Sequence, residues 1–534
     1  MIVAQLKTKG GLALALLALG LPLIAAVLGL LLNLRQLNFV ALLSYPGICT
    51  MIWQGLLVAI VVTVIATLVV MVSSYAISSS GLRSIIAIPN LAFTVGILWL
   101  ITPTGWLWRL LPGIEVDLFD RQYLLTFILI LLLKEIPFLL FMSHRALQQI
   151  PHQKWLIIGQ SQGHSKAKTW WLIVIPALLK RLRLPLMVVA VYSFSVIDIA
   201  LLAAPQLPST LAVQVFEWQL NFTPDARRLA YTGGLVLLAL SGLLCLVVIG
   251  QEYLIGQWSR KRLSSQVSRV ERLALKLLKG LGALPVLTRV FGILALGALL
   301  AQSVSRGWFY PAILPADWTL QGWLQEWSYI WPGVISALGI ALIVGLLSVL
   351  LVTVLLELKR TYHWRYLAIW VLLPLLVPQI LLVLSWHQMT NYSGSEAGYW
   401  LWVIWSHMPF SVAYAYLVLA PQEHAFDQRY VLVGRALGYS FWRSWWRIKR
   451  PLLAGPLYLS LALAMFISVT QYVPTLILGG GRVATVTTDL MAASSGINTQ
   501  LAAIYALMQW LLATGILIGL TGLAGQRGSS AGEQ

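Results

Sequence analysis

Histidine and cysteine are the residues of this sequence with the most obvious chemistry, and their spacing does not build a site. No two histidines stand four residues apart, and no cluster of Asp or Glu accompanies any of them, so the pattern of a metal site is missing. The two cysteines, Cys49 and Cys245, have no metal-ligand spacing. The dipeptide Gly-Lys is absent, which excludes a P-loop and any ATP hydrolysis by the chain itself. We therefore predict no catalytic residue, no cofactor and no metal. The histidines are His144, His152, His164, His363, His387, His407 and His424.

Three ionisable residues lie inside apolar runs, where burying a charge is costly and a functional role is a default hypothesis. Lys134 and Glu135 are neighbours, and neighbours on a helix are not expected to face each other. Asp198 stands alone in a later run. Its carboxylate either lines a path, where it would suit a cation, or serves as a structural hydrogen-bonded group.

The elements that must position these residues are membrane spans. Hydrophobic residues make up 59% of the 534 residues and charged residues 10%, with a mean hydropathy of +0.84. Soluble chains are about 45–50% apolar and about 25% charged. A span needs about 20 apolar residues, and this criterion predicts an all-α polytopic protein with about twelve transmembrane helices. The expected runs are 11–33, 52–77, 85–110, 122–143, 184–204, 229–254, 286–305, 332–356, 366–386, 398–420, 453–478 and 501–524.

The net charge of +19 would suggest nucleic acid in a soluble chain. If the N-terminus is cytoplasmic, however, 28 of the 36 Lys and Arg residues fall in cytoplasmic segments. Basic residues favour the cytoplasmic side of membrane proteins. We therefore expect both termini in the cytoplasm and no nucleic-acid partner.

The sequence contains an internal repeat. Glu135-Ile136-Pro137-Phe138 returns as His407-Met408-Pro409-Phe410, and Thr210 returns as Thr485. The offset between the copies drifts between 272 and 278 residues, as in a duplicated unit with small loop changes. Six helices in each copy give both the same orientation, so the repeats are parallel. We expect a first repeat at 1–255, a basic linker at 256–285 and a second repeat at 286–534.

Two polar segments, 144–183 and 421–455, lie between the fourth and fifth helices of their repeats; they are called the first and second paired loops. Gly163 and Pro176 in the first stand thirteen residues apart, as do Gly438 and Pro451 in the second. This spacing predicts a short helix, a break at Gly, a second short segment and a Pro that starts the next span. Two such loops in register favour a docking surface for a cytoplasmic partner over an ordinary connection.

The paired loops resemble the EAA loop of binding-protein-dependent ABC transporter permeases. The resemblance covers nearly the whole chain as two fused, MetI-like permease copies, closest to the ferric-iron and thiamine uptake type. The matching positions are Gly163, Ile173 and Pro176 in the first loop and Gly438, Ile448 and Pro451 in the second. The Glu-Ala-Ala positions read Ile157-Ile158-Gly159 and Leu432-Val433-Gly434, so the acidic residue is missing from both copies.

The resemblance implies a permease subunit of an importer in a bacterial inner membrane. An external binding protein would deliver a small solute, and a dimer of ATP-binding cassette ATPases would dock at the two paired loops. The Phe-Ser-x-x-acid pattern after the first loop also resembles the family, and Gln471 replaces the acid in the second repeat. The candidate pathway residues are Ser195, Asp198, Ser468 and Gln471.

Two other classes of protein remain alternatives. A twelve-helix secondary transporter also has duplicated halves, but its long cytoplasmic segment would fall at the midpoint, whereas here the 144–183 loop is longer than the midpoint segment. A membrane-embedded enzyme such as a lipid transferase would need a cluster of His, Asp and Glu near one membrane face, and no such cluster is present in the sequence.

Overall fold

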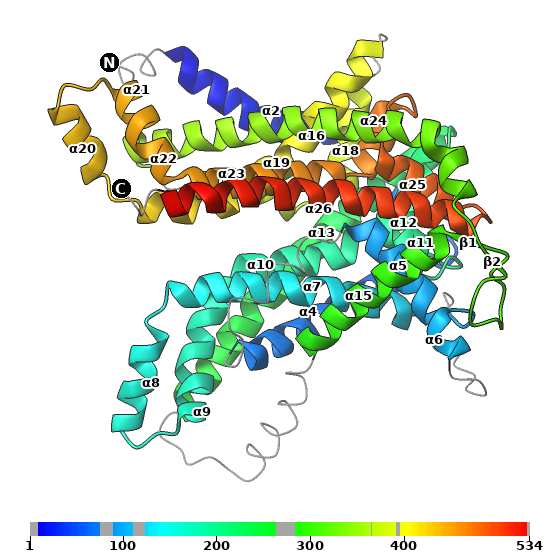
Figure 1. Ribbon diagram of the computed structural model, residues 1–534, viewed down its shortest axis with the longest axis horizontal. Coiled ribbons are helices and arrows are strands. Elements are labelled where there is room, and N and C mark those ends of the chain that lie inside the picture. The colour runs from blue at the N-terminus through cyan, green and yellow to red at the C-terminus, as the bar shows by residue number, and fades with distance from the viewer. Residues whose placement is uncertain are drawn as a thin grey trace. The chain divides into compact units, whose positions relative to one another are not determined.

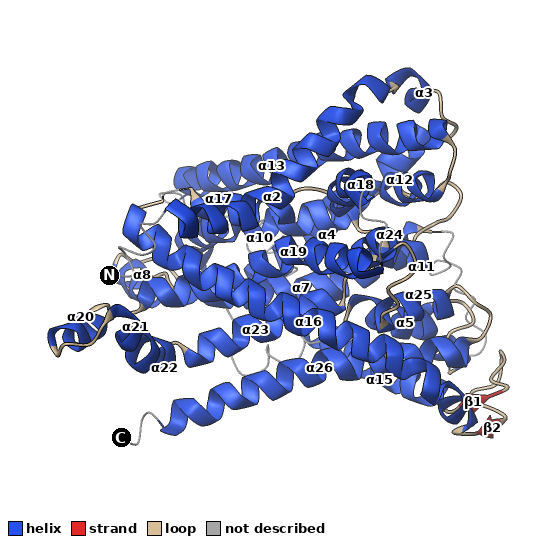
Figure 2. Cartoon of the chain, turned by 90° about the horizontal axis from the view of Figure 1, so that it is seen from above, coloured by secondary structure: helices blue, strands red, loops and turns tan. Residues whose placement is uncertain are grey.

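The structure is a computed structural model that describes residues 9–74, 89–110, 123–262, 284–364, 366–390 and 396–530. The described part is all-α apart from one small hairpin, as Figure 2 shows. The chain divides into two compact units. One contains residues 1–36, 320–375 and 379–534, and the other contains residues 37–319 and 376–378. They are called the late unit and the early unit, and each is described by itself.

The early unit is built on five long helices, α4 (Ile48–Ser73), α7 (Leu124–Gln148), α10 (Ile175–Ser195), α13 (Pro224–Arg262) and α15 (Leu284–Ser303). Helix α10 packs against α4, α7 and α13, while α15 packs against α5 (Asn90–Ile101) and α7. The shorter elements are α3 (Phe39–Leu43), α6 (Trp106–Arg109), α8 (His152–Ser161), α9 (Lys166–Thr169), the π-helical turn η4 (Trp170–Val174), α11 (Asp198–Ala203) and α12 (Leu211–Leu220).

A hairpin of β1 (Ser305–Arg306) and β2 (Asp317–Trp318) follows α15 (Figure 2). Buried Arg109 ties the segment between these strands to α6, because its Nη1 donates a hydrogen bond of 3.0 Å to the carbonyl of Ala312. The same guanidinium lies 5.3 Å from the centre of the Trp308 ring.

The late unit has α16 (Gln321–Tyr362), α19 (Glu396–Ala425), α23 (Ala454–Val469) and α26 (Thr499–Ser530) among its long helices. Helix α23 packs against the other three. The shorter elements are η1 (Leu34–Gln36), α17 (Leu367–Leu372), η5 (Leu373–Leu375), α18 (Gln379–Thr390), α20 (Arg429–Ala436), α21 (Phe441–Ser444), the π-helical turn η6 (Trp445–Lys449), α22 (Arg450–Leu452), α24 (Val473–Gly479) and α25 (Val486–Ser494).

The first helix of the chain, α2 (Lys9–Asn33), belongs to the late unit, and α15, the first helix after the midpoint, belongs to the early unit. Helix α2 packs against α18. The Trp386 indole donates a hydrogen bond of 2.9 Å to the carbonyl of Pro22, and Gln388 donates one of 2.7 Å to the side chain of Asn33. Each compact unit therefore combines one helix from one half of the sequence with the remaining helices of the other half.

Among the described residues, eight helices are long and apolar enough to cross a membrane, or ten if two bent pairs each count as one span. The expectation of twelve is therefore not confirmed. The described apolar part of the first expected span, Pro22–Gln36, is short. The expected span 184–204 is interrupted at residues 196–197, and Lys180, Arg181 and Arg183 occupy the start of α10.

The structure describes only part of the expected linker between the two repeats. Helix α13 continues through Arg262, so the first residues of the expected linker 256–285 are helical. Residues 263–283, which hold most of that linker, lie outside the described residues.

Candidate functional site

The two paired loops have the same local structure. In the first, α8 is followed by Gly163 and then by α9 and η4; in the second, α20 is followed by Gly438 and then by α21 and η6. In Figure 1, α8 and α9 extend from the ends of α7 and α10, and α20 and α21 extend beyond the end of α23. Each loop therefore holds two short helices away from the long helices of its own unit.

Both turns depend on a glycine in the left-handed region. The φ angles of Gly163 and Gly438 are +80° and +83°, which residues with a Cβ rarely adopt. The amide of the next residue donates to the carbonyl five positions back, from His164 to Gly159 and from Tyr439 to Gly434, at 2.9 and 3.0 Å. This is the Schellman ending of a helix. The serines that begin the second short helices, Ser165 and Ser440, accept hydrogen bonds from Lys168 and Arg443.

The third residue of each EAA-like triplet is a packing position. A Cβ added to Gly159 would lie 2.7 Å from Cγ2 of Thr169, and one added to Gly434 would collide with Cδ1 of Ile448. Thr169 and Ser444 occupy equivalent positions, and both are buried. The glycines therefore allow the two short helices of each loop to touch, which the triplet comparison alone did not reveal.

The other two triplet residues are exposed and apolar. Ile157 and Ile158 are 67% and 53% exposed on α8, and Leu432 and Val433 are 59% and 58% exposed on α20. Single exposed apolar residues are ordinary, but here the same pair recurs at equivalent positions of two protruding helices. Such a pair is typical of a protein contact.

The isoleucines of the family-like motif lie within the two loops, and its prolines lie where each loop ends. Ile173 and Ile448 are half-buried in η4 and η6. Pro176 and Pro451 stand in the first turns of α10 and α22, directly after the π-helical turns η4 and η6. The structure thus brings Ile448 against Gly434 within the second loop.

The candidate pathway residue Asp198 of the early unit belongs to a partly buried charged cluster, in which Glu135 is buried and Lys134 and Asp198 are half-buried. Lys134 Nζ is 3.4 Å from Glu135 Oε1, so the expectation that these neighbours cannot meet is wrong. The long lysine side chain can fold back along the helix, which a rule based on Cβ positions neglects. Lys134 also lies 3.7 Å above the ring of Tyr192 and interacts electrostatically with Asp198. Asn90 donates a hydrogen bond of 3.0 Å to the Tyr192 hydroxyl.

The hydroxyl of Ser195 donates its hydrogen bond within its own helix, to the carbonyl of Val191 at 2.7 Å, and not to a member of this cluster.

The equivalent place in the late unit holds a neutral cluster. His407 occupies the position of Glu135 and is buried, with Nδ1 2.9 Å from Ser468 Oγ and Nε2 3.0 Å from Thr475 Oγ1. Gln379 donates a hydrogen bond to the side chain of Gln471.

The hydrogen bonds assign the tautomer of a neutral His407 ring. Thr475 already donates its only hydroxyl proton to the Gln471 carbonyl at 2.7 Å, so it accepts from Nε2–H, and Ser468 donates to Nδ1. The structure thus places Ser468 in contact with His407 and links Gln471 to the same histidine through Thr475.

Sequence reasoning missed several members of these clusters, namely Asn90, Tyr192, Gln379 and Thr475. One signal was available, because Pro89-Asn90 and Pro378-Gln379 start α5 and α18 with the same pattern, a proline followed by a side-chain amide.

Comparison with known proteins gives one curated relative. The chain is 28% identical to the inner membrane ABC transporter permease protein YnjC of Escherichia coli (strain K12) over 445 residues, which cover 82% of this chain and 79% of the relative. That relative is an inner-membrane permease. The similarity supports a membrane permease of an ABC transporter, in agreement with the several apolar spans of the structure. No protein-family model and no solved structure matches the chain.

Proposed function

We propose that the chain is the transmembrane subunit of an ABC importer and that its two paired loops are the docking sites for a pair of ATP-binding cassette ATPases. The observation that carries this proposal is the recurrence of the same exposed apolar pair, Ile157-Ile158 and Leu432-Val433, on the first short helix of each loop. The similarity to an ABC transporter permease points to the same class of partner.

The exposed side chains of the two loops also predict which residue types the partner surface should carry. Exposed arginines surround the apolar pair of α20, among them Arg429, Arg435 and Arg443. Lys154 and Lys166 are exposed on the first loop. An ATPase that fits these loops needs an apolar socket with an acidic margin, because opposite charges steer association and choose the partner.

The rest of the proposal concerns the solute and the sides of the membrane. Both termini and both paired loops lie in the cytoplasm, and a binding protein delivers a small solute to the other face. The solute passes the buried clusters that contain Asp198, Ser468 and Gln471. The two halves are MetI-like repeats of the ferric-iron and thiamine type, with the repeat boundary in 256–285.

Purification in mild detergent tests the proposal. A protein with a P-loop should co-purify with the wild-type chain, and the double variant I158D/V433D should lose it, because a charge in each apolar contact removes a central anchor. Central anchors contribute about 2 kcal/mol or more each, so we expect at least a 30-fold loss of affinity.

The matched control is I497D, which changes a fully exposed isoleucine in the turn between α25 and α26. It should retain the ATPase. Absence of any P-loop protein from the wild-type preparation, together with uptake that survives depletion of ATP, would overturn the proposal.

A further inference from the structure

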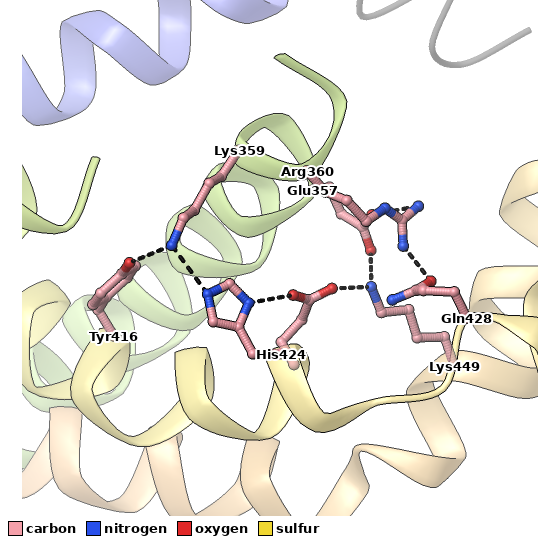
Figure 3. A network of polar contacts seen from close by, with 8 residues as sticks. Glu357, Lys359, Arg360, Tyr416, His424, Gln428 and Lys449 are labelled. Carbon is pink, nitrogen blue, oxygen red and sulfur yellow. Dashed lines mark hydrogen bonds and ion pairs between the residues drawn. The ribbon is translucent and has the colours of Figure 1, made fainter. Parts of the chain in front are cut away.

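A single buried lysine ties the second paired loop to the helices of its unit. Lys449 is the last residue of η6 and is 3% exposed. Its Nζ lies 2.5 Å from Glu357 Oε1 at the end of α16 and 2.7 Å from Glu423 Oε1 at the end of α19. Figure 3 shows this ammonium group between the two carboxylates. One side chain therefore joins the loop to two long helices.

The two carboxylates are themselves held in place (Figure 3). Arg360 lies 3.3 Å from Glu357 Oε2 and donates to the side chain of Gln428, just before α20. Lys359 donates hydrogen bonds to Tyr416 and His424, at 3.4 and 3.2 Å, and so adds a second link between α16 and α19. The ends of α16 and α19 thus form one charged platform beneath the loop.

The first paired loop is joined to its unit in another way. The residue equivalent to Lys449 is Val174, which is fully buried. Helix α9, η4 and α10 follow one another without a break up to Ser195. The indole of buried Trp170 in η4 also donates a hydrogen bond of 3.3 Å to the carbonyl of Met71 on α4. The first paired loop is therefore joined to its unit by an unbroken helical segment that is packed in the core.

The second paired loop lacks that continuity. The helical segment that contains η6 ends at Leu452, the next one begins at Ala454, and their axes differ by 77°. Arg450 and Leu452, next to the bend, are exposed. The loop segment and α23 therefore do not share one helix axis, and a push along the axis of the loop segment is not directed along α23.

We propose that Lys449 is a positioning residue that carries movement of the second paired loop to α16 and α19, and that its ion pairs replace the helix continuity of the first loop. The inference rests on the proposed function, because the movement originates in an ATPase bound to the loop. Helix α19 also carries His407, so the ion pairs connect the loop to the helix of the neutral cluster.

A distance measurement tests the inference without knowledge of the solute. Spin labels are placed at Leu401 on α19 and Ile518 on α26, both exposed, after Cys49 and Cys245 are replaced by serine. The distance is recorded for the complex with its ATPase, without nucleotide and with Mg-ATP and vanadate. We expect a nucleotide-dependent shift in the wild type and its loss in K449M, while the ATPase still co-purifies in equal amount.

The matched control is K359M, which removes a cation from the same platform that bonds Tyr416 and His424 rather than Lys449. It should keep the shift, and K449R, which keeps the charge and the reach, should restore it. Removal of one member of a buried ion group can unfold a protein. The triple variant E357Q/K449M/E423Q leaves no buried charge without a partner, because Arg360, which loses Glu357, is exposed, and it should fold normally yet still lack the shift.

Three results would overturn the inference: a wild type with no shift, a K449M variant with the full shift, or a triple variant in which the shift returns. Failure of the wild type to bind any P-loop protein would instead overturn the proposed function, and the two failures are therefore distinguishable.

Discussion

The Nδ1 atom of His407 lies 2.9 Å from Ser468 Oγ, and this contact joins α19 to α23 inside the late unit. The equivalent residues of the early unit, Glu135 and Ser195, make no such pair, because Glu135 meets Lys134 and Ser195 bonds its own helix. The two corresponding polar places therefore differ, because one holds charges and the other holds hydrogen bonds between uncharged side chains.

Replacement of His407 by leucine should destabilise the late unit. The variant loses hydrogen bonds to Ser468 and Thr475 and leaves their hydroxyls in an apolar environment, with an expected cost of about 1–3 kcal/mol. Thermal unfolding in detergent measures the effect. H424L, at an exposed histidine, should cost less than about 1 kcal/mol. Equal losses in the two variants would contradict the role of His407.

Replacement of Lys134 by methionine should be more damaging. It removes the cation that Glu135 and Asp198 share, and breaking a buried ion group in this way costs about 3–5 kcal/mol. The triple variant K134M/E135Q/D198N removes all three charges and should recover most of the loss in a thermal unfolding assay. A triple variant as unstable as K134M would show that the charges do not act as one group. K154M, on an exposed lysine, is the control.

The close contact inside each paired loop predicts unequal effects of alanine at equivalent glycines. G159A places a methyl group against Thr169, whose β-branched side chain is stiff, whereas G434A meets the flexible end of Ile448. We expect about 1–3 kcal/mol of local destabilisation for G159A and less for G434A.

Limited proteolysis of the loops and co-purification of the ATPase would report these losses. G242A on α13 is the matched control, because a Cβ at Gly242 meets no atom within 4 Å. If G159A and G242A are cut at the same rate, the packing argument fails.

The attachment of α2 to the late unit predicts a sharp difference between two glycines of the same helix. A Cβ on Gly29 would lie 2.5 Å from the carbonyl oxygen of Ser385 on α18, whereas a Cβ on Gly20 would make an ordinary contact with Ile24. G29V should therefore separate α2 from α18 and lower the unfolding temperature, and G20V should change it little. Disulfide formation between cysteines at Asn33 and Gln388 measures the attachment directly, and an unchanged yield in G29V would contradict the prediction.

Local patterns in the sequence were sufficient for much of this protein. Long apolar runs predicted most of the helices, because the length of a span is a property of consecutive residues. The Gly163 and Gly438 turns were equally accessible, since a left-handed residue that ends a helix calls for glycine wherever it occurs. The resemblance to ABC transporter permeases, which rested on these short patterns, agrees with the permease relative.

Tertiary structure alone decided which helices share a unit and which charges meet. The apolar sequence of α2 does not say which half it packs against, because apolar residues face lipid and protein alike in a membrane protein. Its bonds to Trp386 and Gln388 span more than 350 residues. Likewise, Lys449 was read from sequence only as one of the basic residues of a loop, and its two carboxylate partners lie 92 and 26 residues away. The sequence by itself determined the local elements and their repetition, whereas contacts between distant segments depend on packing that no local pattern encodes.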